Sequence, residues 1–126
     1  MAIVAIAGLG EVVVGLSPED VSAAHLPGAM VAILGGLTGI TLTGAALARH
    51  AGWRGLGLWG VGLGAFGLVS AVVGLTLAPV RVFGLFERMA AYPILIWLIL
   101  TGVTVLRRIR RREPPTGADA RAGEAA

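Results

Sequence analysis

Four apolar stretches, separated by short polar segments, dominate the pattern along the chain. They cover about residues 2–16, 26–48, 55–78 and 89–106. A helix rises about 1.5 Å per residue and the hydrocarbon core of a bilayer is about 30 Å thick, so about 20 apolar residues suffice to cross it. We therefore expect an all-α integral membrane bundle with four transmembrane helices.

The first stretch is short, and it contains a charged residue, Glu11. Its length of about 22 Å falls below the thickness of the hydrocarbon core. An ionisable side chain inside a span is costly, which makes Glu11 a candidate for an ion or proton role. A secretory signal peptide is the competing interpretation, but nothing basic follows Met1 and Glu11 interrupts the apolar run. We expect a truncated or partly exposed membrane helix.

A helix-start pattern follows this first stretch. Ser17 is a favourable N-cap, Pro18 suits the first helical position, and Glu19 and Asp20 place acids in the first turn. This pattern predicts a short interfacial helical turn that extends to about Ala24.

The segment before the fourth stretch is predicted to be a loop over Val80–Arg88. Pro93 would then lie near the start of a helix that begins about Met89, where the missing N–H costs least. A helix that began upstream of Glu87 would instead contain Pro93 in its interior.

The composition supports a bilayer environment. The chain is 56% hydrophobic and 13% charged, whereas soluble domains carry about 25% charged residues. Its 20 glycines are spread through the apolar stretches. Small residues let membrane helices approach closely, so the glycine-rich faces could pack within the chain or in a homo-oligomer. The absence of cysteine excludes disulfides, thiol catalysis and thiolate metal sites.

The basic residues, all of them arginine, predict the orientation. Arg49, Arg54 and a cluster in residues 107–112 fall on one side of the four predicted spans, while Arg81 and Arg88 fall on the other. The positive-inside rule places the first group, and both termini, in the cytoplasm of a cell-membrane protein. Because the arginines flank apolar segments, we expect no nucleic-acid partner.

The last twenty residues, 107–126, are predicted to form a basic stop and a disordered cytoplasmic tail. The arginines of the cluster are expected to determine topology and could also bind anionic lipid headgroups, each contributing about 1 kcal/mol near the surface. The cluster consists of Arg107, Arg108, Arg110, Arg111 and Arg112.

Candidate chemistry gathers on the predicted outer side, at Glu19, Asp20, His25, Glu87 and Arg88. Carboxylates with a histidine could act as general acid and base or hold a divalent cation, as in an enzyme that works on lipid headgroups. The simpler interpretation is structural, with the acids bonded to backbone N–H groups and one of them paired with a nearby arginine. Because one histidine and scattered acids match no metal motif, we expect no metal and no cofactor.

Two separated motifs resemble a known family of polytopic membrane proteins. Residues 15–20, GLSPED, followed by His25, resemble the GLFPED…H signature of the family called domain of unknown function 998. The ending ER…YP…W…G of that family resembles Glu87, Arg88, Tyr92, Pro93, Trp97 and Gly102. The resemblance covers Gly8 to Leu106 and implies a helical membrane fold without an established activity.

This chain departs from the family pattern in two ways. Ser17 stands where the family usually has phenylalanine. Family members usually have about six spans, and the four spans predicted here resemble the last four of them. Either the true start lies upstream of Met1 or the chain is a short variant.

The sequence leaves the function open between classes. A non-enzymatic structural, interaction or lipid-contacting membrane protein is the leading hypothesis. The alternative is a membrane-embedded enzyme or solute-handling protein with its site at the outer interface. A third class is a subunit of a larger complex.

Overall fold

The computed structural model of this chain describes residues 2–17, 23–77 and 80–111. Its elements are α1 (Ala2–Leu16), α2 (His25–Ala48), the short 3-10 turn η1 (Ala51–Trp53), α3 (Arg54–Leu77) and α4 (Val80–Arg110). No strand occurs within the described ranges. The all-α prediction is confirmed.

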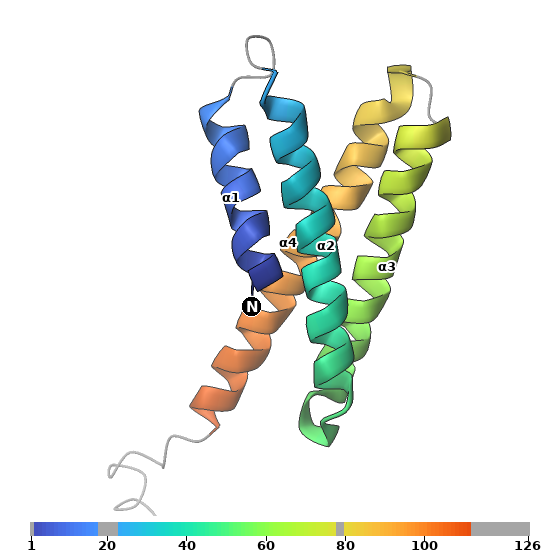
Figure 1. Cartoon of the computed structure of the whole chain (residues 1–126). Coiled ribbons are helices and arrows are strands. Elements are labelled where there is room, and N and C mark those ends of the chain that lie inside the picture. Colours follow the sequence, from blue (N-terminus) through green and yellow to red (C-terminus); the bar gives the residue numbers. More distant parts are fainter. Residues whose placement is uncertain (1, 18–22, 78–79, 112–126) are drawn as a thin grey trace, which may run out of the picture.

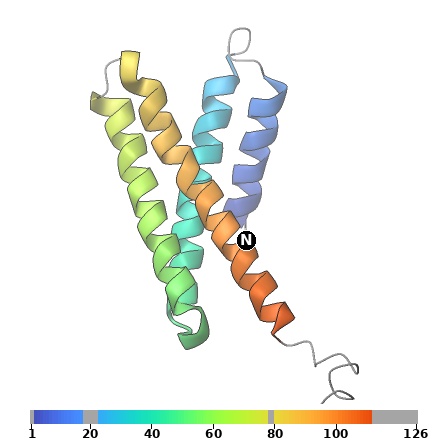
Figure 2. The same cartoon turned by 180° about the vertical axis from the view of Figure 1, so that it is seen from behind.

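Three of the helical segments are long and apolar enough to cross a membrane. They are His25–Ala48, Ala51–Leu77 and Gly84–Arg110, whereas the apolar part of α1, Ala5–Leu16, is shorter. Helices α2 and α3 run side by side in opposite directions, and α4 crosses behind α2 in Figure 1 and in front of it in Figure 2, which shows the opposite side. Helix α1 lies along only the first part of α2, so its N-terminus is at about mid-height of the bundle (Figure 1).

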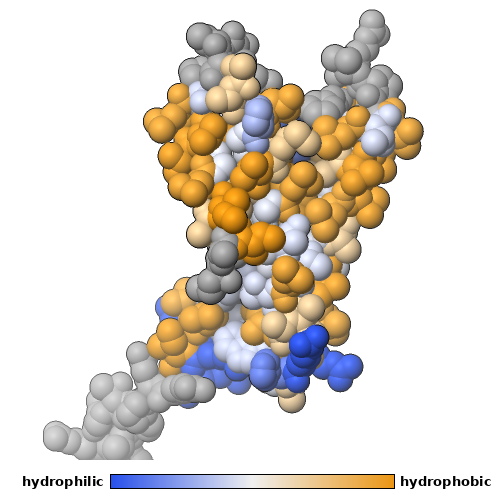
Figure 3. Space-filling model, in the orientation of Figure 1, coloured by the Kyte–Doolittle hydropathy of each residue, from blue (hydrophilic) through white to orange (hydrophobic). Residues whose placement is uncertain are grey.

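The two ends of the bundle differ. We call the end with η1 and the last turn of α4 the basic end, because Arg49 and Arg54 flank η1 and further arginines lie in the last turn of α4. We call the end at which α2 and α4 begin the groove end. Space-filling colours in Figure 3 show hydrophilic residues collected at the basic end and hydrophobic residues over most of the remaining surface.

Helices α2 and α3 meet backbone to backbone along a seam of glycines. A Cβ atom added at Gly44 would lie 2.7 Å from the carbonyl oxygen of Gly57, and one added at Gly60 would lie 3.0 Å from the Cα of Gly44. Further along, Gly64 faces Thr41. Such contact is open only to residues without a side chain. Of the two possibilities for the glycine-rich faces, the glycine face of α3 takes the first and packs within the chain.

Helix α4 docks on this pair through one large aromatic side chain. Trp97 is buried, and its indole N–H donates a hydrogen bond to the carbonyl of Leu56 over 3.4 Å. It lies over Gly60 and belongs to a core of five buried residues. They are Leu37, Ile40, Leu56, Ala90 and Trp97.

Helix α1 has a single neighbour in the described part of the chain, α2. Small residues again form the contact, since a Cβ on Gly10 would lie 2.6 Å from the amide nitrogen of Ala32, and one on Gly35 would lie 3.1 Å from the Cβ of Ala7. The position of α1 therefore depends on α2 alone.

The predicted loop over Val80–Arg88 is wrong, because α4 begins at Val80. Apart from Gly84, this segment contains no helix breaker, and its charged residues are compatible with a helix that emerges from a membrane. Pro93 consequently lies inside α4, where its missing N–H leaves the carbonyl of Met89 without its usual partner. The helix also continues through Arg110, so most of the basic stop is helical. The predicted turn over residues 18–22 lies outside the described residues.

Candidate functional site

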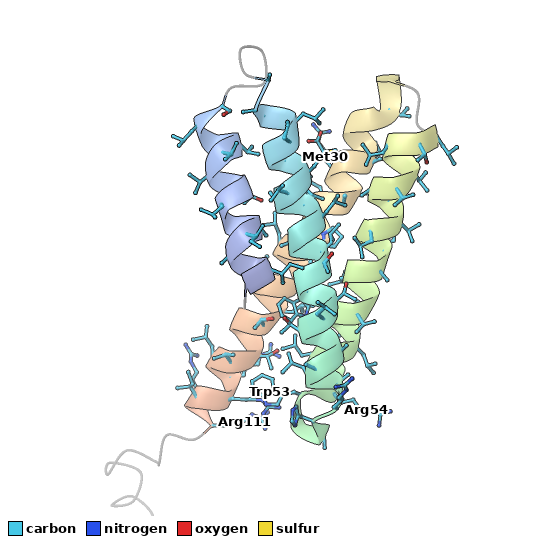
Figure 4. The ribbon with its side chains drawn as sticks, in the orientation of Figure 1. Met30, Trp53, Arg54 and Arg111 are labelled. Carbon is cyan, nitrogen blue, oxygen red and sulfur yellow. The ribbon has the colours of Figure 1, made fainter. Side chains whose placement is uncertain are left out.

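The structure offers two places where polar chemistry meets the apolar bundle, one at each end. At the basic end, the turn between α2 and α3 lies at the same level as the last turn of α4 (Figures 3 and 4). This brings together arginines that are far apart in the sequence. They are Arg49, Arg54, Arg107, Arg108, Arg110 and Arg111, and all except the partly buried Arg108 are exposed. The remaining predicted residue, Arg112, lies outside the described ranges.

Arg108 connects the two segments of the basic end. Its guanidinium carbon stands 3.8 Å from the centre of the Trp53 ring, a geometry worth about 0.5–1 kcal/mol where exposed and more where water is excluded. A pocket of about 180 Å³ adjoins this contact, lined by Trp53, Val105, Arg108 and Ile109. Only the fold identifies Arg108 as the partner of Trp53.

At the other end, a groove lies between α2, α3 and α4. It encloses about 60 Å³, which exceeds the space taken by one water molecule. Apolar side chains make up its walls, and a carboxylate, Glu87, completes the lining. Among the residues that line it are Leu26, Ala29, Met30, Leu75, Phe86 and Glu87. In Figure 4, Met30 lies between α2 and α4 on the groove side.

Glu87 lies about two helical turns, or about 10 Å, from the start of α4. The residue is largely exposed while lining the groove, so its carboxylate is at the groove's mouth rather than at its floor. No ion pair forms among the described side chains, and Glu87 therefore lacks the pairing with Arg88 that the structural interpretation suggested. The side chain of Arg81 lies outside the described set.

His25 has a backbone partner. Its Nδ1 is 2.6 Å from the carbonyl oxygen of Ser17. A carbonyl can only accept a hydrogen bond, so Nδ1 carries the proton. The bond joins the end of α1 to the first residue of α2 and gives His25 a structural role.

Three of the five residues of the predicted outer-face cluster lie within the described ranges. His25, Glu87 and Arg88 all lie in the first turns of α2 or α4 at the groove end, whereas Glu19 and Asp20 fall outside the described residues. Within the described ranges, no group of three or more His, Asp or Glu side chains could hold a metal ion.

Glu11 is exposed on α1. It lies about 7 Å from the C-terminal end of that helix, at Leu16. Gly10, its neighbour, takes the contact with α2 instead.

Comparison with known protein families, with curated proteins and with solved structures finds no match to this chain. The resemblance to domain of unknown function 998 therefore stays a prediction that rests on its two motifs. Within the second motif, Pro93 and Trp97 are buried whereas Glu87, Arg88 and Tyr92 are exposed.

Proposed function

We propose that this chain is a multi-pass integral protein of the cell membrane with a non-enzymatic, lipid-contacting role. Large apolar side chains cover the outside of the helices, among them Leu42, Val69 and Ile99, each more than half exposed. A surface so continuously apolar is far larger than a soluble monomer tolerates. In a bilayer the same surface is solvated by lipid.

The observation that carries the proposal is the gathering of arginines at one end of helices long enough to cross a membrane. With the basic end in the cytoplasm, these arginines face the anionic inner leaflet. Each guanidinium near that surface contributes about 1 kcal/mol of attraction. The basic end would then both fix the orientation and hold anionic headgroups.

The finer topology is part of the proposal. Helices α2, α3 and α4 would make three crossings and place the C-terminus in the cytoplasm. The four-span arrangement, with the N-terminus also in the cytoplasm, requires the segment that contains α1 to form the remaining crossing. Membership of domain of unknown function 998 is proposed on the motifs that include Pro18 and Pro93.

Self-association is proposed separately, with a second copy as the partner. Several glycines on the helix surfaces have open space in place of a side chain, among them Gly8, Gly62 and Gly102. Such positions allow another helix to approach closely. Crosslinking in native membranes should yield a discrete dimer or higher oligomer that Gly62→Leu weakens. A monomer at all expression levels would contradict this part.

Reporter fusions and alkaline extraction test the membrane proposal. The chain should remain in the pellet after carbonate washing, and a C-terminal fluorescent protein should fold and fluoresce in the cytoplasm. A C-terminal phosphatase should be inactive. Release of the chain by carbonate would refute membrane integration, and an active phosphatase fusion would refute the orientation. An N-terminal reporter tests the four-span form.

The alternative, an enzyme or solute-handling protein with a site at the outer face, is favoured by one observation: Glu87 lines a groove. Under that alternative, alanine at His25 or Glu87 should abolish a cellular phenotype at unchanged membrane abundance. Under our proposal, His25→Ala removes the hydrogen bond to Ser17, and abundance should fall in parallel with any phenotype.

A further inference from the structure

The groove differs from the rest of the apolar surface because it combines hydrocarbon walls with a single charge. Met30, Leu75 and Phe86 come from three different helices, and Glu87 stands beside them at the mouth. A carboxylate without an ion-pair partner next to apolar walls favours an amphiphile with a cationic group. Charge complementarity therefore narrows what the groove accepts.

The depth of Glu87 in the bilayer further restricts the ligands that the groove can bind. About 10 Å separates this residue from the start of α4. In the proposed orientation, this distance places the carboxylate near the boundary between headgroups and acyl chains of the outer leaflet. The groove below Glu87 then lies at the depth of the acyl chains, where lipid hydrocarbon is the most abundant occupant.

Arg88 adds a second charge at the same depth. It follows Glu87 directly on α4 and is exposed like Glu87, beside the groove rather than in its lining. A simple cation drawn to Glu87 would be repelled by the neighbouring guanidinium. A headgroup that carries both an ammonium and a phosphate complements both side chains. A primary ammonium also donates N–H groups to the carboxylate, a charge-assisted hydrogen bond that a quaternary amine cannot make.

We propose that the groove is a binding site for an outer-leaflet aminophospholipid. The ammonium pairs with Glu87, the phosphate lies toward Arg88, and part of one acyl chain occupies the space between Met30, Leu75 and Phe86. This inference rests on the proposed lipid-contacting function and specifies the class of lipid that is bound.

Native mass spectrometry of the full chain, purified in mild detergent, tests the site. The protein is equilibrated with equal amounts of phosphatidylethanolamine, phosphatidylcholine and phosphatidylglycerol with matched acyl chains. The wild-type protein should carry at least about fivefold more phosphatidylethanolamine than phosphatidylcholine, a preference of about 1 kcal/mol, while phosphatidylglycerol reports binding at the basic end. Equal occupancy by phosphatidylethanolamine and phosphatidylcholine would overturn the proposal.

Paired variants separate this site from general lipid contact. Glu87→Gln should remove the preference, while Glu11→Gln, which changes another exposed carboxylate outside the groove, should leave it intact. Ala29→Leu fills the groove and should lower total lipid retention, whereas Ala65→Leu on an exposed face of α3 should not. An unchanged preference in Glu87→Gln would overturn the proposal.

Carbonate extraction and the C-terminal reporter are measured on the same variants. Retention in the membrane with the predicted orientation, together with no preference for phosphatidylethanolamine over phosphatidylcholine, would reject the lipid site and leave the proposed function standing. Release from the membrane would reject the proposed function itself. Binding of phosphatidylglycerol alone would place lipid selectivity at the basic end and contradict the groove site.

Discussion

The contact between α2 and α3 and the space between α2 and α4 show how residue size sets the distance between helices. Along the first contact, Gly44, Gly57 and Gly60 bring the backbones together without room for a Cβ atom. At the groove end, α2 presents Met30 and α4 presents Phe86, and a cavity remains between them. Glycines on both helices close the first interface, whereas at the second the small side chains of Ala29 and Ala90 leave space beside Met30 and Phe86.

The same comparison separates structure from function. The glycine seam between α2 and α3 consists mainly of backbone packing, and we expect it to contribute to the stability of the fold. The groove has poorer packing but brings a carboxylate to an apolar recess. The substitutions below should therefore act on stability at the seam and on binding at the groove.

The largest effect is expected from a side chain in the seam. A Cβ at Gly57 would lie 2.6 Å from the carbonyl oxygen of Gly44, so Gly57→Leu must push α2 and α3 apart. The cost should reach about 3 kcal/mol or more, and folded protein should hardly accumulate in the membrane. Gly55→Leu is the matched control, since open space surrounds that position on the same helix. Equal abundance of the two variants in membrane fractions would contradict the packing.

The next effect concerns Trp97, which docks α4 on the seam. Trp97→Ala removes a buried indole and its hydrogen bond to Leu56, and should cost about 3–5 kcal/mol. Trp59→Ala removes the same side chain from a position that is 62% exposed and should cost far less. Thermal unfolding in detergent, followed by near-UV circular dichroism, measures both. Similar midpoints for the two variants would argue against the docking of α4.

A smaller effect is expected at the basic end. Trp53→Leu removes the stacking partner of Arg108 and should cost about 1 kcal/mol. A double-mutant cycle with Arg108→Gln should show coupling of similar size, and Arg107→Gln, an exposed neighbour, should show none. Additive effects of Trp53→Leu and Arg108→Gln on the unfolding midpoint would show that the contact contributes nothing.

The smallest effect on stability is expected at the groove. Ala29→Leu adds apolar volume to existing space, so the unfolding midpoint should stay within about 1 kcal/mol of the wild-type value or rise slightly. Thermal unfolding measures the change against Ala65→Leu. A destabilisation as large as that of Gly57→Leu would mean that α2 and α4 are as tightly packed as α2 and α3.

The sequence predicted the second and third helices within a residue or so of their bounds. Their ends are marked by polar residues such as Arg49 and Arg54, and their interiors are uniformly apolar. The start of α4 could not be predicted in this way. Glu87 and Arg88 resemble a loop in water, yet charged side chains near a membrane surface are equally compatible with an emerging helix.

The groove and the contact between Trp53 and Arg108 could not be predicted from the sequence for a different reason. Both depend on how helices distant in the chain cross, which local hydrophobicity does not encode. The sequence did single out Glu87, by its charge and its place in a motif. It could not show that this carboxylate lines a recess formed by α2 and α3.

Cysteine accessibility tests the orientation of the bundle most directly, because the chain contains no cysteine. Ala23→Cys and Ala51→Cys introduce single thiols at exposed positions of the groove end and the basic end. A membrane-impermeant maleimide added to intact cells should label Ala23→Cys and should label Ala51→Cys only after the membrane is opened. The reverse pattern, or equal labelling of both thiols in intact cells, would contradict the account.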